Sequence, residues 1–244
     1  MHAYLSASLD LMGLPEVIQR LWGGLVVSCQ AGPDEPLFGA GYMAAMAKAA
    51  LQGGAVGIRA NTPEDIAAIR AAVTLPIIGI YKVDLPDFAV RITPTVEYAC
   101  QVAVAGADII AVDATHRPHP DGLNFSERVQ ALKALTRCPV MADVSNLEEG
   151  LAAEASGADV VATTLSGYTV SAPVPPGPDF DLLEELVKRV KIPVIAEGRI
   201  ATPLQAAQAM AAGAFAVVVG GAITRPQWIT AQFVQEIKRQ LAPG

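Results

Sequence analysis

Five charged residues stand where short apolar runs end, and together they could carry acid–base chemistry. Only 17% of the chain is charged, so the repetition of charge at this position is informative. The five are Arg59, Lys82, Asp113, Asp143 and Glu197. A lysine in dry surroundings can remove a proton or form a Schiff base, and a carboxyl group can give or take a proton. The set predicts proton-transfer or imine chemistry; mutual pairing of the charges is the other interpretation.

Lys82 and Glu197 are the catalytic pair that we expect. To act as a base, Lys82 must be neutral, a state that desolvation and a nearby Arg59 would favour. Glu197 and Asp143 would favour the charged lysine instead. A Schiff-base role for Lys82 and a plain surface cation stay open as alternatives.

Two glycine segments near the end of the chain are typical of a phosphate site. Gly198 and Arg199 follow one apolar run, and Gly220 and Gly221 follow the next. Glycine lets the main chain approach a ligand, and its N–H groups together with a following helix N-terminus can bind an anion. Arg225 could add a charge-assisted hydrogen bond. We expect phosphate binding here, with simple tight turns as the other interpretation.

A scaffold with many converging strand ends would position these residues. A Gly-Ala pair before an apolar run recurs at residues 54, 106, 157 and 213, and a Pro opens such runs at 76, 139 and 193. With a first strand at 24–30, the pattern predicts eight strands. Each Gly suits the end of a preceding helix. The clearest helical stretches are Pro63–Val73, Phe125–Thr136, Leu147–Ala155 and Pro203–Ala212.

Alternating strands and helices predict a parallel sheet, and eight units in about 250 residues favour a closed (β/α)8 TIM barrel of the phosphate-binding type. The C-terminal ends of its strands converge, so the five charges would surround one cavity. We expect one catalytic domain over residues 1–244, with a short N-terminal helix at Leu14–Leu21 that closes the barrel bottom. An open doubly wound sheet is the other architecture. Long connections at 83–94 and 166–178 are interpreted as lids.

Composition narrows the class of protein and its location. A net charge of -7 and a pI of 4.9 argue against a nucleic-acid or anionic-membrane surface. No apolar run reaches the roughly 18 residues of a membrane span, and Met1–Asp10 lacks the layout of a signal peptide. Three cysteines without CxxC spacing favour a reducing cytoplasm. Because no histidine ends a strand, we expect no metal site and interpret His116 and His119 as loop surface.

Eight motifs spread over the chain carry a resemblance to a known family. They are Val27-Ser28-Cys29-Gln30, Gly57-Ile58-Arg59, Ile78-Gly79-Ile80-Tyr81-Lys82, Val112-Asp113-Ala114-Thr115, Met141-Ala142-Asp143, Thr163-Thr164-Leu165-Ser166-Gly167-Tyr168-Thr169, Ala196-Glu197-Gly198-Arg199 and Gly221-Ala222-Ile223-Thr224-Arg225-Pro226. With them the chain resembles the N-acetylmannosamine-6-phosphate 2-epimerases of sialic acid catabolism. One departure follows Thr115: the family usually repeats Arg-Pro, whereas this chain has a histidine at 116 and another at 119.

The resemblance implies an isomerase that interconverts N-acetylmannosamine 6-phosphate and N-acetylglucosamine 6-phosphate, without cofactor or metal. It implies that Lys82 is the catalytic lysine and Glu197 its acidic partner. With the glycine segments, the expected substrate-binding set is Gln30, Arg59, Asp143, Gly198, Arg199, Gly220, Gly221 and Arg225. In the open-chain sugar the C2 proton lies next to the C1 aldehyde, so a base and a proton donor suffice. The sequence leaves open whether Glu197 returns the proton or only positions a substrate hydroxyl.

Three other functions share part of this pattern. They are an aldolase with Lys82 as Schiff base, a pentose-phosphate 3-epimerase, and a non-catalytic phosphosugar-binding protein. The second usually needs strand-end histidines as metal ligands, and those are absent here. The stretch Gln227–Leu241 has apolar residues at helical spacing and is expected in the core, with a dimer contact as the other interpretation. A homodimer is implied by the resemblance alone.

Overall fold

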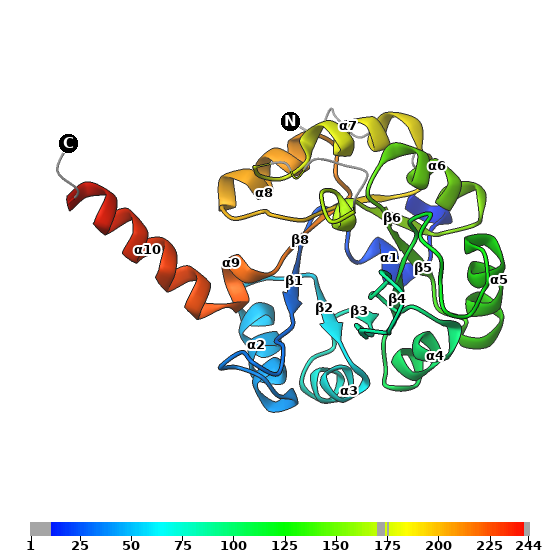
Figure 1. The fold of residues 1–244 in the computed structure, drawn as a ribbon, viewed down its shortest axis with the longest axis horizontal. Helices are drawn as coiled ribbons and strands as arrows, with labels where there is room; N and C mark the ends of the chain where they lie inside the picture. The colour runs from blue at the N-terminus through cyan, green and yellow to red at the C-terminus, as the bar shows by residue number, and fades with distance from the viewer. Residues whose placement is uncertain (1–10, 170–173, 175, 242–244) are drawn as a thin grey trace.

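The computed structural model describes residues 11–169, 174 and 176–241, and its centre is a closed barrel of eight parallel strands (Figure 1). The strands are β1 (Leu25–Cys29), β2 (Gly57–Asn61), β3 (Ile77–Ile80), β4 (Ile109–Asp113), β5 (Val140–Asp143), β6 (Val160–Ala162), β7 (Val194–Glu197) and β8 (Ala216–Val219). They follow one another in chain order, and β1 also pairs with β8. The predicted barrel is therefore confirmed, and the open sheet is wrong. The extent of the domain over all of 1–244 stays a prediction.

A helix follows every strand, and all of these helices except α10 lie around the barrel (Figure 1). They are α2 (Ala40–Gln52), α3 (Pro63–Ala72), α4 (Val96–Val104), α5 (Phe125–Thr136), α6 (Leu147–Ala155), α7 (Phe180–Arg189), α8 (Pro203–Ala211), α9 (Gly221–Thr224) and α10 (Pro226–Leu241). Thr62 and Thr202 cap α3 and α8 ahead of a Pro at the first helical position. The four clearest helical stretches of the sequence are thus confirmed to within one residue at their ends.

The Gly-Ala repeat ends helices, as its sequence position predicted. All four glycines have positive φ, a conformation that glycine adopts without the strain of a Cβ atom. The alanine after each glycine donates its N–H to a carbonyl in the last turn of the helix, for example Ala55 to Ala50 at 3.0 Å and Ala158 to Ala153 at 3.0 Å. This is the Schellman pattern that closes a helix before a strand begins. The repeat is therefore structural.

The segment before β1 closes the N-terminal end of the barrel. It holds the short helix α1 (Glu16–Gln19), and Ile18 and Leu21 are fully buried against the side chains inside the barrel. A Cβ atom on Gly57, the first residue of β2, would lie 2.6 Å from the Leu21 side chain, so the glycine makes room for the leucine. The predicted N-terminal helix and its closing role are confirmed.

The connection after β3 folds back over the strand end. A β-bridge joins Lys82 and Ile92 in antiparallel fashion. The N–H of Thr93 donates to the carbonyl of Tyr81 at 2.8 Å, and the N–H of Lys82 donates to Asn61 Oδ1 at 2.7 Å. The main chain at Lys82 is therefore fixed from both sides.

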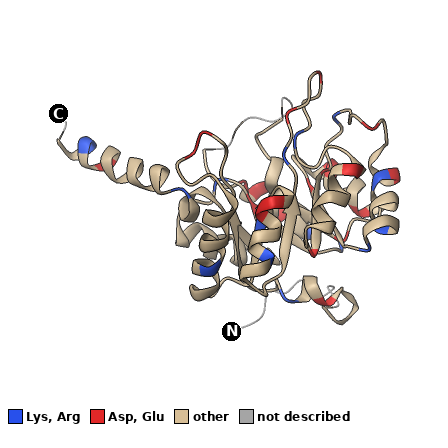
Figure 2. Ribbon diagram, turned by 90° about the horizontal axis from the view of Figure 1, so that it is seen from below, with Lys and Arg blue, Asp and Glu red and all other residues tan. Residues whose placement is uncertain are grey.

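The C-terminal helix corrects one prediction. We expected Gln227–Leu241 in the core, but none of the sixteen residues of α10 is buried. Figures 1 and 2 show the helix extending away from the barrel. Its amphipathic spacing would be the same against this barrel or against another surface, so the sequence pattern could not tell the two apart.

Candidate active site

A cavity of about 860 Å³ opens at the C-terminal ends of the strands. It brings together most of the residues predicted to do chemistry. Its lining includes Lys82, Asp113, Thr164, Glu197, Gly198, Arg199, Gly220, Gly221 and Arg225. The parallel barrel explains this convergence, because every strand delivers its last residue to the same end.

A buried ionic network lies behind the cavity. The Arg59 side chain, 1% exposed, contacts Asp143 Oδ2 at 2.5 Å and Glu197 Oε2 at 2.6 Å. The Thr164 hydroxyl lies 2.7 Å from Asp143 Oδ1 and 3.2 Å from Glu197 Oε2, and it can donate its one proton to either oxygen. The predicted residues of β2, β5 and β7 therefore meet in one paired network. Their predicted roles toward a substrate stay a prediction.

One cation and two carboxyl groups leave this network with an excess of negative charge. Burial would lower the pKa of Arg59, but the carboxylates of Asp143 and Glu197 outweigh burial and raise it, so the guanidinium stays charged. Burial raises the pKa of Glu197, and the charge of Asp143 adds to that effect against the opposing pull of Arg59. Glu197 is therefore the member disposed to carry a proton.

Lys82 lies across the cavity from this network. Its Nζ donates to Gln30 Oε1 at 2.7 Å, and the Gln30 amide in turn donates to the Ser28 hydroxyl at 2.8 Å. Lys82 is exposed to solvent through the cavity, and the protein atoms of the barrel mouth surround its side chain. Desolvation by these atoms, followed by the Arg59 cation, lowers the pKa of Lys82 to about 8. A neutral amine is thus accessible near physiological pH.

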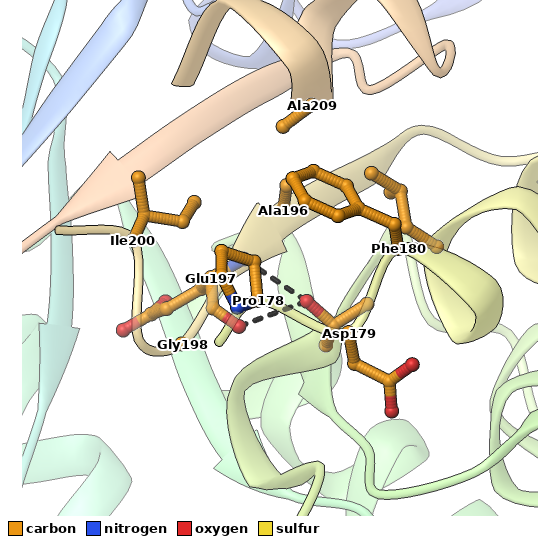
Figure 3. A pocket seen from close by; sticks show the side chains of 10 residues that line it. Pro178, Asp179, Phe180, Ala196, Glu197, Gly198, Ile200 and Ala209 are labelled. Carbon is orange, nitrogen blue, oxygen red and sulfur yellow. Dashed lines mark hydrogen bonds between the residues drawn. The ribbon is translucent and has the colours of Figure 1, made fainter. Parts of the chain in front are cut away.

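Strand order places the two groups on opposite sides of the barrel. Lys82 follows β3 and Glu197 ends β7, and in the closed order β1 to β8 these strands are half the ring apart. The main chain of Glu197 is also fixed, because its N–H and its carbonyl both bond to the Thr163 hydroxyl (dashed lines in Figure 3). A ligand in the cavity would lie between an amine and a carboxyl group.

The two glycine segments lie in the same cavity, between β7, β8 and the first turn of α9. Gly220 approaches β1 closely, since a Cβ atom there would lie 3.4 Å from Ser28 Cβ. Arg225 pairs with Glu35, with its Nε 2.7 Å from Oε1, and its side chain is 45% exposed. The predicted phosphate role of these residues stays a prediction.

Arg199 reaches away from the glycines toward the connection after β6. Its guanidinium donates to the carbonyls of Gly177 at 2.8 Å and Ser166 at 2.6 Å, and it lies 5.4 Å from the centre of the Tyr168 ring. In this arrangement Arg199 links two loops, and its predicted contact with substrate stays a prediction.

The loop after β4 corrects the interpretation of one histidine. His116 is exposed as expected, whereas His119 is only 8% exposed, with its Nδ1 3.1 Å from the Pro94 carbonyl. Burial, followed by the Arg128 cation, lowers the pKa of His119. Its surroundings come from the connection after β3, which local sequence does not reveal. Asp113, also buried, binds Arg117 at 2.5 Å at the cavity edge.

Sequence reasoning assigned no role to Thr163, Thr164 or Asn61, although all three hold a predicted site residue. The two threonines directly follow β6, a strand that does not end in a charged residue. Their position at a strand end is the sequence feature that could have indicated a role in the site. Within residues 11–169, 174 and 176–241, no group of three or more His, Cys, Asp or Glu residues could hold a metal ion. None of the helices in this part of the chain is both long and apolar enough to cross a bilayer.

Comparisons with known proteins agree on one family. The family model described as "NanE: Putative N-acetylmannosamine-6-phosphate epimerase" matches residues 43–239. A protein of Caldanaerobacter subterraneus subsp. tengcongensis, named "Putative N-acetylmannosamine-6-phosphate 2-epimerase", is 51% identical over 226 residues, or 92% of this chain and 95% of that protein. A protein of the same name from Listeria monocytogenes is 47% identical over 226 residues, or 91% of this chain and 98% of that protein.

Solved structures extend the comparison to three dimensions. The N-acetylmannosamine-6-phosphate 2-epimerase from Clostridium perfringens matches with a TM-score of 0.88 and 48% identity, covering 91% of this chain and 96% of that one. A thiamine phosphate pyrophosphorylase from Pyrococcus furiosus, with a TM-score of 0.58 and 21% identity, shares the fold alone. The resemblance seen in the sequence motifs is confirmed: this chain belongs to the N-acetylmannosamine-6-phosphate epimerase family.

Proposed function

We propose that this protein interconverts N-acetylmannosamine 6-phosphate and N-acetylglucosamine 6-phosphate by proton transfer at C2, through Lys82 and Glu197. The observation that carries the proposal is the placement of an amine and a carboxyl group on opposite sides of one cavity. Inversion at carbon needs removal of one proton from one face and delivery of another proton to the opposite face. Two groups half a barrel apart meet that requirement.

The chemistry can be written with these two groups alone. Neutral Lys82 takes the C2 proton of the open-chain sugar, and the electron pair of the broken C–H bond moves into an enolate with the C1 aldehyde. Protonated Glu197 then gives its proton to C2 from the opposite face, and the aldehyde re-forms. Lys82 ends as the ammonium and Glu197 as the carboxylate, so the reverse reaction uses the same groups in exchanged roles.

The remaining residues of the predicted set support this pair in different ways. Gly220, Gly221 and Arg225 bind the phosphate, because main-chain N–H groups at a loop and a nearby guanidinium suit an anion. Gln30 orients the amine of Lys82 through the 2.7 Å hydrogen bond. Arg59 and Asp143 are 1% and 0% exposed, so they act on the sugar through Glu197 rather than by direct contact.

The test follows the C2 proton directly. The protein is incubated with N-acetylmannosamine 6-phosphate in deuterium oxide, without added metal, and observed by NMR beside a Lys82→Ala variant. We expect the gluco epimer with deuterium at C2, and no exchange in the variant. Wild-type protein that leaves C2 untouched would refute the epimerase proposal and favour a phosphosugar-binding protein. Trapping of an imine by borohydride would favour an aldolase.

We further propose that the protein is a homodimer joined through α10. The apolar side chains of Phe233, Ile237 and Leu241 are 69%, 59% and 77% exposed, and their four-residue spacing places them on one face. The ten residues from Pro226 to Gln235 carry no charge, and the ribbon of Figure 2 has its blue and red segments toward the free end of the helix. Such a helix needs an apolar partner surface.

The same chain offers that surface. A groove of about 380 Å³ lies beside α8, β8 and β1, where the last helix of the surrounding ring would lie. Leu25, Ala206, Met210, Val217 and Val219 line it. Because nothing in residues 11–169, 174 and 176–241 covers either the helix or the groove, a second copy can fill each groove with the other copy's helix, in a closed two-fold arrangement.

Sedimentation velocity tests the dimer. We expect a dimer for the wild type and a monomer for Phe233→Asp, with Gln235→Asp on the opposite face of the helix as the matched control. A wild-type monomer would refute the exchange.

The three cysteines are unpaired thiols, which supports the proposed location in the reducing cytoplasm.

A further inference from the structure

Two consecutive threonines after β6 contact Glu197, one at its main chain and the other at its carboxyl group. The Thr163 hydroxyl donates to the Glu197 carbonyl at 2.8 Å and accepts from its N–H at 3.0 Å, which fixes the main chain (Figure 3). The Thr164 hydroxyl lies 3.2 Å from Glu197 Oε2 and 2.7 Å from Asp143 Oδ1, at the other end of the side chain. Both threonines belong to one turn, Thr163–Leu165, so a single element spans backbone and carboxyl group.

The two oxygens of the Glu197 carboxyl group therefore have different surroundings. Oε2 contacts Arg59 Nη1 at 2.6 Å and the Thr164 hydroxyl at 3.2 Å. Oε1 makes no hydrogen bond with any residue in the described ranges. The side chain lines the cavity and is 14% exposed. Oε1 is thus the oxygen left to a bound substrate.

Arg59 alone does not determine where Oε1 lies. With a single N–H contact to Oε2, the carboxyl group could still turn about that contact. The Thr164 hydroxyl reaches the same oxygen from β6, whereas Arg59 reaches it from β2, so the two contacts arrive from different strands. Two contacts of different direction restrict the plane of the group, as a preorganised site requires.

We propose that Thr164 is a positioning residue for Glu197, holding Oε2 so that Oε1 is presented to C2 of the sugar. The inference rests on the epimerase function proposed above. It assigns Thr164 no contact with the reacting atoms. Its loss should therefore slow the chemical step while leaving substrate affinity nearly unchanged.

Valine has the shape of threonine without the hydroxyl, so Thr164→Val is the informative variant, and Thr164→Ser keeps the hydroxyl. We expect Thr164→Val to lower kcat about 10- to 100-fold with KM within about twofold, which is the range for a lost hydrogen bond to a charged group. Thr164→Ser should recover most of the activity. The matched control is Thr136→Val, which removes a hydroxyl bonded to Leu132 and Cys138 at the opposite end of the barrel. It should keep the wild-type kcat.

A second readout does not depend on turnover. The hydrogen bond from Thr164 lowers the pKa of Glu197, so its removal should move the carboxyl titration to higher pH. Carbon-13 NMR of the glutamate carboxyl groups, assigned with Glu197→Gln, measures this in the absence of substrate. A Thr164→Val protein with unchanged titration and unchanged kcat would overturn the inference, as would a loss confined to KM or a Thr164→Ser variant as impaired as Thr164→Val. Inactive wild-type protein with a shifted titration in the variant would reject the epimerase function but not the positioning of Glu197.

Discussion

Replacing Arg59 by leucine tests the buried network most directly. The guanidinium contacts Asp143 at 2.5 Å and Glu197 at 2.6 Å, and the exposed fractions of the three side chains are 1%, 0% and 14%. Leucine would leave two carboxyl groups close together and without a cation. Breaking a buried ion pair on one side costs about 3–5 kcal/mol. For a chain of this size, such a loss corresponds to a fall in Tm of about 6–20 °C.

The loss of stability expected for Arg59→Leu depends on pH, and the direction of that dependence can be worked out. Burial and the charge of Asp143 already raise the pKa of Glu197, and without Arg59 that pKa rises further above its value in the unfolded chain. The folded variant then binds protons more readily than the unfolded chain, so its stability falls as pH rises through the raised pKa. The destabilisation relative to wild type should be larger at pH 8 than at pH 5, because protonation removes the repulsion at low pH.

Thermal unfolding followed by circular dichroism measures the effect, with Arg70→Leu as the control. Arg70 pairs with Asp108, but these side chains are 31% and 39% exposed, so its loss should cost about 1 kcal/mol or less. If Arg59→Leu costs no more than Arg70→Leu, or if its cost does not change with pH, then Arg59 does not neutralise the two buried carboxylates and the reasoning is refuted.

Two further predictions concern Lys82 and the barrel bottom. In the direction that uses Lys82 as base, the mechanism needs a neutral Lys82 and a protonated Glu197, so the epimerisation rate should be bell-shaped with pH and have one limb near the lysine pKa of about 8; a kcat/KM profile flat across that pH would contradict the role of the neutral amine. Leu21→Ala should lower the free energy of unfolding by about 2–5 kcal/mol, since Leu21 is fully buried, yet leave kcat per folded molecule unchanged. Urea unfolding and single-turnover rates measure the two quantities, and a lower kcat would show that the bottom of the barrel acts on the site.

The barrel and the location of its site were predictable because their signals are local or periodic. A Gly-Ala pair ends a helix whatever lies around it, and parallel strands deliver their last residues to one edge. From these rules alone, Arg59, Asp143 and Glu197 could be assigned to the same end of the barrel, although only Glu197 of the three lines the cavity. The same rules could not show that the three would bind one another, because that depends on which rotamers the neighbouring strands permit.

Features that depend on distant partners were not predictable in this way. Arg225 was expected to face a ligand, and its pairing with Glu35 joins residues from opposite ends of the chain. His119 is buried by the connection after β3 rather than by its own loop. The helix α10 has the periodicity of a packed helix, but periodicity does not identify the surface on which it packs. In each case the sequence shows the type of residue, but its contacts depend on the tertiary structure.

The charges of the site suggest why a lysine and a glutamate suit this reaction. Before turnover the proposed pair is a neutral amine and a neutral acid; afterwards it is an ammonium and a carboxylate, so the net charge of the cavity is the same. Desolvation lowers the pKa of Lys82 and raises that of Glu197, and both shifts bring the two forms closer in free energy. Arg59 then has opposite effects on the two groups, because it disfavours the ammonium and favours the carboxylate. Asp143 raises the pKa of both Lys82 and Glu197, whereas Arg59 lowers both. The buried network can therefore balance the two directions of a reversible epimerisation.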